Sequence, residues 1–297
     1  MHRKQILEYI ALALIWGSSF VLMREVIKAF GWAGSVSLRA LTASAVLYIA
    51  ARLSKKKLNF GTSRRHFVVV GATTVAIQLA GLGIGTPRIG TAMCAIFVGA
   101  MPLISMLIGQ LWGIEHLSRN GKFGLVTGIA GLILLVGFPA VDITGDFIVG
   151  CIAMMCGITA AAVGSNYSHK FLSDIGSWEQ TIGAFFFGGA MTLPLLFIAP
   201  LPTTPQIRDY ALLILLAAGC SSLTYVLYFR LVADVGATIA ISVEFLVTLV
   251  AVVIGAGLLG EQLSSIQIVG AVTIISSCIL VLNLIPSRAR LAPERSS

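Results

Sequence analysis

Three glycines near the end of the chain form the first motif with a chemical meaning. The stretch "GAGLLGEQLS" (255–264) places Gly255, Gly257 and Gly260 in the G-x-G-x-x-G spacing of dinucleotide-binding loops. Such a loop works only where it closes a β-strand, opens a helix and precedes an acidic residue that holds the ribose. The residues before it, "ISVEFLVTLVAVVI", are instead a long apolar run with a single charge. This context argues against a nucleotide site.

The other reactive side chains show no catalytic or metal-binding spacing. The chain has no P-loop, no H-E-x-x-H motif, and no Ser/Lys or paired-Asp set within its apolar segments. We therefore predict no enzymatic activity, no metal and no cofactor. None of the cysteines is in C-x-x-C spacing, and we interpret all five as small buried thiols: Cys94, Cys151, Cys156, Cys220 and Cys278.

Composition sets the class of protein. Hydrophobic residues make up 57% of the 297 positions and charged residues 11%, whereas a soluble domain has about 45–50% and about 25%. Runs of about 20 apolar residues match the thickness of a bilayer core. We predict an all-α integral membrane protein with ten transmembrane helices, over 5–23, 33–53, 66–85, 90–112, 122–138, 148–170, 178–199, 209–231, 236–258 and 265–285.

The basic residues are distributed as membrane topology requires. The net charge is +8 and the pI is near 9.5, which on a soluble chain would suggest nucleic acid. With a cytoplasmic N-terminus, 15 of the 20 Lys and Arg residues fall on the cytoplasmic side and 4 on the opposite side. This positive-inside pattern predicts that both termini, with the tail 287–297, are cytoplasmic, and we expect no nucleic-acid partner.

The chain contains an internal repeat. Shifted by 146 positions, residues 90–124 lie over 236–270 with eight of 35 positions identical. The glycine motif is therefore the end of the ninth helix. We assign 1–140 to a first five-helix repeat and 147–286 to a second. An odd number of helices per repeat inverts the second copy in the membrane, which is the architecture of many secondary transporters.

Two glutamates occupy matching hairpins of this repeat. Glu115 and Glu261 end the fourth and ninth helices, and Ser118 and Ser264 stand where the next helices begin, as N-caps do. A carboxylate at a helix C-terminus opposes the helix dipole, so it is better satisfied by the free amides of the following helix. We favour this hairpin-locking role over the alternative, a role in gating or ion binding.

Several stretches of the sequence resemble the EamA-type carriers of the drug/metabolite transporter superfamily. They are "WGSSFVLMRE" (16–25), "SLRALTASAVL" (37–47), "GIEHLSRNGKFG" (113–124) and "GEQLSSIQIVG" (260–270). The resemblance covers essentially the whole chain, and within the family the sequence is most similar to bacterial aromatic amino acid exporters. One departure is that Pro102 of the fourth helix is matched by Thr248 in the ninth. The resemblance implies export of small metabolites across the bacterial inner membrane without covalent chemistry.

The midplane of such a fold gives the candidate cavity. Aromatic surface with a few amide and hydroxyl groups suits an amphipathic solute of the size of phenylalanine or methionine. Helix packing is the alternative role for each of these residues. The candidates are Trp16, Ser18, Ser19, Gln78, Phe97, Met101, Asn166, Tyr167, Tyr225, Ser242, Glu244 and Phe245. Glycine pairs in G-x-x-x-G spacing are interpreted as close helix contacts: Gly81/Gly85, Gly109/Gly113 and Gly124/Gly128.

Glu244 is the one acidic residue that falls deep inside a predicted span. It lies eight residues after Gly236, or about 12 Å below the surface of a core about 30 Å thick. A carboxylate at this depth costs on the order of 3 kcal/mol and is by default a functional candidate. Three roles remain open: binding of a substrate ammonium or a proton, a structural hydrogen bond to a serine, and a pair with Arg39.

The leading function is a secondary carrier that exports aromatic and other hydrophobic amino acids as a monomer in the lipid bilayer. An exporter of other drugs or metabolites and a non-transporting membrane scaffold are the alternatives. A scaffold gives no reason for an inverted duplication. A membrane-embedded enzyme would need intramembrane catalytic groups, which the sequence lacks.

Overall fold

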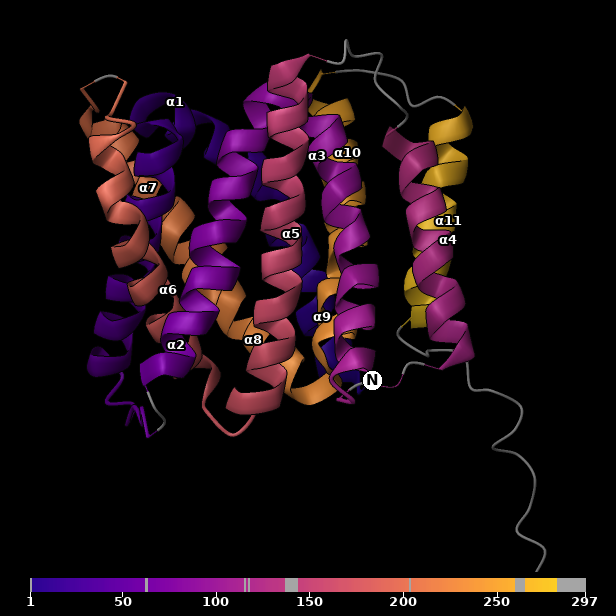
Figure 1. The fold of residues 1–297 in the computed structure, drawn as a ribbon, viewed down its shortest axis with the longest axis horizontal. Coiled ribbons are helices and arrows are strands. Elements are labelled where there is room, and N and C mark those ends of the chain that lie inside the picture. The colour runs from indigo at the N-terminus through magenta and orange to yellow at the C-terminus, as the bar shows by residue number, and fades with distance from the viewer. Residues whose placement is uncertain are drawn as a thin grey trace, which may run out of the picture.

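The computed structural model describes residues 2–61, 64–114, 116, 118–136, 144–202, 204–259 and 265–281, and within these ranges every regular element is helical (Figure 1). The helices stand side by side along one direction. Five helical segments are long and apolar enough to cross a membrane: Glu25–Leu53, Arg64–Ile89, Gly145–Leu172, Ser177–Phe197 and Ile207–Val235. The predicted all-helical class is confirmed, and the count of ten transmembrane helices stays a prediction.

Helix α1 (Arg3–Leu53) contains the first two predicted transmembrane helices. Gly31 interrupts it with φ 66° and ψ 176°, a conformation that L side chains rarely adopt. The first helix therefore continues to residue 30, seven residues beyond the predicted end at 23. Lys28 and Glu25, which we had expected in a loop, form an i,i+3 ion pair of 2.7 Å on its last turns. This pairing between helical neighbours gives a physical reason for the longer helix.

The next helical stretch contains α2 (Arg64–Val70), the π-helical segment η1 (Gly71–Ile77) and α3 (Gln78–Leu111). Cys94 Sγ lies 3.7 Å from Thr86 Oγ1, although eight residues of straight helix span about 12 Å. The stretch therefore folds back near Pro87, in agreement with the predicted break between 85 and 90.

Gly113 follows α3 with φ 65°, and no atom lies within 4 Å of the position of its missing Cβ. It terminates the helix, so its predicted helix-packing role was wrong.

The second half repeats this plan. It consists of α5 (Gly145–Leu172), α6 (Ser177–Thr192), the 3₁₀ segment η2 (Leu193–Phe197), α7 (Ile207–Ala217), the π-helical segment η3 (Ala218–Leu223), α8 (Thr224–Val235), α9 (Ala237–Ile241), α10 (Val243–Leu259) and α11 (Ser265–Val281). Segment η3 begins 147 residues after η1.

The glycines of the dinucleotide-like motif lie in a helix. Gly255 and Gly257 are within α10, which excludes the strand-to-helix loop that a dinucleotide site needs, and Gly260 lies outside the described residues.

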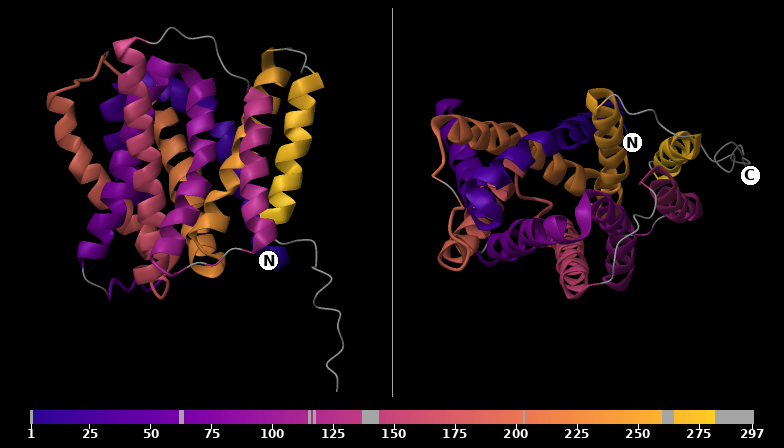
Figure 2. Two further views of the ribbon diagram at one scale, coloured as in Figure 1. Left: turned by 45° about the vertical axis from the view of Figure 1, so that its right-hand side comes forward. Right: turned by 90° about the horizontal axis from the view of Figure 1, so that it is seen from above.

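Helices α4 (Arg119–Val136) and α11 form an antiparallel pair at one side of the molecule (Figures 1 and 2). Glycines make their close approach possible. A Cβ at Gly270 would lie 2.5 Å from the backbone nitrogen of Leu135, and one at Gly124 would lie 2.9 Å from the side chain of Val281. Gly128 leaves room for the ring of Phe245 in the same way. The predicted packing role of Gly124 and Gly128 is confirmed.

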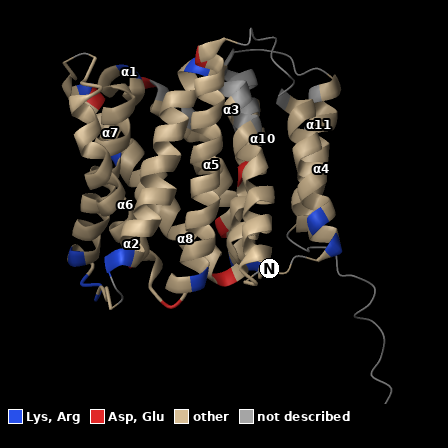
Figure 3. Ribbon diagram, viewed as in Figure 1, with Lys and Arg blue, Asp and Glu red and all other residues tan. Residues whose placement is uncertain are grey.

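Lys and Arg residues gather mainly at the end of the bundle where the N-terminus lies, and others lie at the opposite end and within the bundle (Figure 3). The end with the N-terminus contains the segment 52–57, which is exposed. The prediction that cysteines are buried was wrong for Cys156, which is exposed, while Cys94, Cys220 and Cys278 are buried. In a membrane helix both faces are apolar, so sequence alone does not show which face meets lipid.

Candidate functional site

An aromatic cluster joins the two halves of the chain. The Trp16 ring of α1 lies 5.5 Å from Tyr225 and 5.6 Å from Tyr228 of α8, measured between centroids. Phe185 of α6 packs edge-on against Tyr225 at 4.7 Å. Trp16 Nε1 donates to Thr224 Oγ1 at 2.9 Å, which fixes the indole against α8. The predicted residues Trp16 and Tyr225 are thus brought together.

The Tyr225 side chain is close to two groups of opposite charge. It is buried, and both the Arg39 guanidinium and the Glu244 carboxylate are close enough for their charges to act on its hydroxyl. The hydroxyl of the neighbouring Tyr228 is hydrogen bonded to Ser165 at 2.6 Å. The surroundings of the cluster therefore combine apolar ring surface with one cation and one anion.

Glu244 follows a break in the helix that carries it. The short helix α9 ends at Ile241, Ser242 forms a turn, and α10 begins at Val243. Glu244 is thus in the first turn of α10, where the helix dipole favours a negative charge. The interruption is one residue long, because Ser242 keeps helical backbone angles of φ −60° and ψ −10°. Thr248 itself lies within α10, six residues after this turn, and the different bending of the two halves stays a prediction.

Neither of the two structural roles considered for Glu244, a hydrogen bond to a serine and a pair with Arg39, is present among the described residues. No hydrogen bond or ion pair reaches its carboxylate from the described residues, and it is half-buried. The Ser242 hydroxyl is occupied by Tyr9 at 2.9 Å and by the Ile239 carbonyl at 2.7 Å. Arg39 donates to Ser221 Oγ at 2.7 Å and does not pair with Glu244. The carboxylate is therefore available for a ligand.

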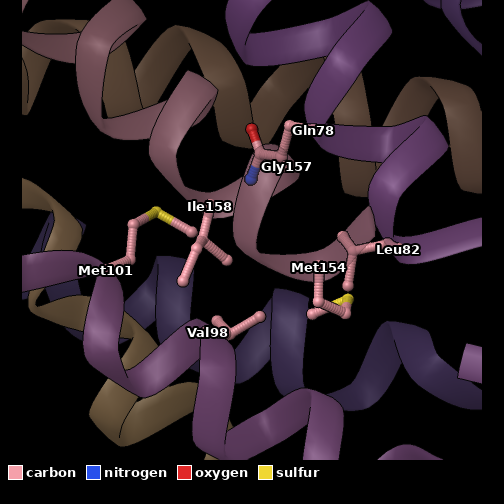
Figure 4. A pocket seen from close by; sticks show the side chains of 7 residues that line it. All are labelled: Gln78, Leu82, Val98, Met101, Met154, Gly157 and Ile158. Carbon is pink, nitrogen blue, oxygen red and sulfur yellow. The ribbon is translucent and has the colours of Figure 1, made fainter. Parts of the chain in front are cut away.

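Gln78 and Met101 line a cavity of about 170 Å³ between α3 and α5 (Figure 4). The other lining residues are Leu82, Val98, Met154, Gly157 and Ile158. This space is too small for a solute of amino acid size, so binding of such a solute here requires the helices to separate. The predicted contribution of Gln78 and Met101 to one cavity agrees with this arrangement.

Asn166 is held by helix packing instead of lining this cavity. It is fully buried, and its Nδ2 donates to Ser105 Oγ at 2.8 Å and to the Ala162 carbonyl at 2.9 Å. Its Oδ1 is buried and has no hydrogen-bond partner. The amide thus ties α5 to α3, and it satisfies its donors as a buried polar group in a membrane must.

The remaining candidates lie apart from the aromatic cluster or form their hydrogen bonds within their own helix. Tyr167 contacts His66 at 2.7 Å and packs on Phe171, while Phe245 fills the space beside Gly128. The Ser18 and Ser19 hydroxyls donate to carbonyls of their own helix. Phe97 packs, half-buried, against the main hydrophobic core.

The hairpin residues are only partly described. Glu115, Glu261 and Ser264 lie outside the described residues. Ser118 accepts a hydrogen bond from the Gly121 amide at 3.0 Å, which confirms the predicted N-cap of α4.

Sequence analysis missed three members of the aromatic cluster, Phe185, Tyr228 and Phe229, and also Tyr9, whose hydroxyl contacts Ser242. Tyr228 had a usable signal, because it stands three residues after Tyr225 and therefore shares its helix face. Phe185 and Tyr9 had none, since each reaches the site only through the packing of another helix.

The comparison with protein families decides the assignment. The description "EamA-like transporter family" matches residues 4–137 and again 148–283, which together cover most of the chain. The chain belongs to the EamA-like transporter family. Two copies of one domain, joined in the segment that we predicted to link two repeats, agree with the internal duplication. The family indicates a membrane transporter and not an enzyme.

Relatives of similar length support this EamA assignment. Protein PecM of Dickeya dadantii is 25% identical over 288 residues, covering 95% of this chain and 94% of its own. The inner membrane transporter YedA of Escherichia coli K12 is 25% identical over 292 residues, covering 95% and 93%. A solved crystal structure matches the fold with a TM-score of 0.79 at 13% identity, covering 98% of this chain and all of its own. The comparisons therefore support a multi-pass membrane transporter.

Proposed function

We propose that this EamA-like transporter exports small amphipathic metabolites, with aromatic and other hydrophobic amino acids as the main substrates. The observation that carries the proposal is the aromatic cluster of Trp16, Phe185 and Tyr225, which has the buried cation Arg39 and the carboxylate Glu244 in its surroundings. An amino acid with an apolar side chain presents a carboxylate, an ammonium group and a hydrophobic surface. The candidate site offers a matching partner for each.

Alternating access between two inverted five-helix repeats is the mechanism that we propose. Two structural correspondences support it. The π-helical segments η1 and η3 begin 147 residues apart, close to the 146-residue shift of the sequence repeat. Gly124 contacts Ser277 and Val281, while Gly270, 146 positions later, contacts Gly131 and Leu135, which are the counterparts of Ser277 and Val281 at the same shift.

The ends of the helices near the N-terminus are held together by an ion pair between the proposed repeats. Arg230 Nη1 of α8 lies 2.8 Å from Glu8 Oε1 of α1, and the Glu8 side chain is buried. We assign this end to the cytoplasm from the gathering of basic residues. Entry of a solute from the cytoplasm then requires this pair to separate. We expect a single chain to be sufficient for transport.

The test of function is uptake of radiolabelled phenylalanine into vesicles of lipid and purified protein alone, with and without a proton gradient. We expect Gln78→Trp to lower uptake at least tenfold, because the indole fills the small cavity beside Met101. Ile77→Trp is the matched control, since the Ile77 side chain is exposed on the bundle surface. Cells that make the native protein should resist toxic aromatic amino acid analogues, and cells that make Gln78→Trp should not. Neither should resist acidic analogues.

Equal uptake by protein-free vesicles would contradict a transport function. Normal uptake by Gln78→Trp would contradict the position of the cavity. Asn166→Trp is a poorer test, because full burial of Asn166 makes that variant a test of folding.

A second prediction concerns topology. Single cysteines at Lys56 and Gly145, in a variant without the native cysteines, should react with an impermeant maleimide from opposite sides of the membrane. Both positions are exposed, and an added Cβ at Gly145 meets no atom within 4 Å. We expect Gly145→Cys to label in intact cells and Lys56→Cys only after the membrane is opened. Labelling of both in intact cells would refute the assignment of the basic end to the cytoplasm.

A further inference from the structure

Arg39 is a buried cation without an acidic partner among the described residues. Its side chain is only 7% exposed. Its Nε donates to Ser221 Oγ at 2.7 Å and its Nη1 contacts Met23 Sδ at 3.7 Å, and both of these partners are neutral. The ion pairs found in the described part of the chain are Lys28–Glu25, Arg88–Asp146 and Arg230–Glu8. A buried charge left without a counter-charge is expensive, so its retention calls for a compensating ligand.

The guanidinium lies in the wall of a cavity of about 300 Å³ between α1 and α3. Ser35 is the other hydroxyl-bearing or charged side chain of this wall, and it too is buried. The rest of the lining is mainly apolar, with Met23, Ile27, Trp32 and Leu79 as its large members. The cavity therefore combines one positive charge with an aromatic and aliphatic surface.

This chemistry selects an anion with an apolar body. A guanidinium presents several N–H groups in a fixed plane, and two of them bind the two oxygens of a carboxylate together. Inorganic anions match the charge but gain nothing from Trp32 and Leu79. A neutral amide of the same shape matches the apolar wall but leaves the cation unpaired.

We propose that Arg39 binds the carboxylate of the transported solute, with the apolar part of the solute against the wall formed by Trp32 and Leu79. The inference rests on the proposed transport function and specifies its substrates as hydrophobic monocarboxylates. The hydrogen bond from the Arg39 Nε to Ser221 holds the guanidinium against the second half of the chain, one helical turn before Tyr225.

The first test measures binding of 3-phenylpropanoate and of its neutral amide to the purified full-length protein in lipid nanodiscs. We expect the native protein to bind the acid at least tenfold more tightly than the amide. Arg39→Gln should bring this ratio close to one, and Arg39→Lys should retain part of it. Lys28→Gln is the control, because it removes an exposed cation of the same helix and should leave the ratio unchanged.

The second test remains informative if Arg39→Gln does not fold. A cysteine at Ser35, in a chain without the native cysteines, should be protected from a small thiol reagent by 3-phenylpropanoate and not by the amide. Equal binding of acid and amide by the native protein, or equal protection by chloride or phosphate, overturns the proposal. Carboxylate binding through Arg39 without phenylalanine transport would refute the proposed function and leave the anion site. Normal phenylalanine transport by Arg39→Gln would refute the role of Arg39 in binding the substrate carboxylate and would leave the proposed transport function intact.

Discussion

Replacement of Glu244 by glutamine should lower phenylalanine transport at least tenfold while the protein is made and inserted normally. The substitution keeps the shape and hydrogen-bonding capacity of the side chain and removes its charge. The carboxylate lies in the first turn of α10, beside the aromatic cluster, and no described side chain pairs with it. A glutamine there cannot attract an ammonium group or carry a proton across the membrane.

Two measurements separate the possible roles of Glu244. If it binds the substrate ammonium, Glu244→Gln loses the preference for phenylalanine over 3-phenylpropanoate, which lacks that group. If it carries a proton, the variant keeps phenylalanine exchange and loses its dependence on pH. Glu25→Gln serves as the control, because Glu25 forms an exposed pair with Lys28 and such pairs contribute little. Transport that is unchanged over a range of pH would leave Glu244 with a structural role only.

The boundaries of most helices could be predicted because lipid imposes a simple rule on the sequence. A span must be apolar over about 20 residues, and its backbone groups must bond within the helix. The rule fails where a helix continues past the membrane surface, as α1 does up to Gly31. There Lys28 and Glu25 are charged and still helical, and they form an exposed ion pair on the last turns before Gly31.

The depth of a residue was therefore easier to predict than the direction of its side chain. Trp16 and Tyr225, both predicted from their depth, are in ring contact, whereas Tyr167, predicted from its similar depth, packs with His66 and Phe171. Helices that are apolar on every face carry no pattern that distinguishes lipid from protein neighbours. Asn166 shows the same limit, since the donors of its amide find partners in Ser105 and the Ala162 carbonyl through helix packing.

The close contact between α4 and α11 predicts the largest effect on stability. A Cβ at Gly270 would lie 2.5 Å from the Leu135 nitrogen and 2.8 Å from the Gly131 oxygen. These are backbone atoms, so a rotamer change cannot relieve the overlap and the two helices must separate. Because packing and not the hydrophobic effect holds membrane helices together, the pair has little to replace this contact. We expect Gly270→Ala to cost at least about 2 kcal/mol of stability.

The matched control for Gly270→Ala is Gly219→Ala, since a Cβ at Gly219 meets no atom within 4 Å. Both changes add one methyl group to a helical glycine, and alanine is intrinsically the better helix former by about 1 kcal/mol. Thermal unfolding of the purified proteins in detergent should therefore show a lower midpoint for Gly270→Ala and an unchanged or higher one for Gly219→Ala. Equal midpoints would mean that α4 and α11 do not pack through Gly270. The matching contacts of Gly124 and Gly270 would then no longer support the inverted repeat.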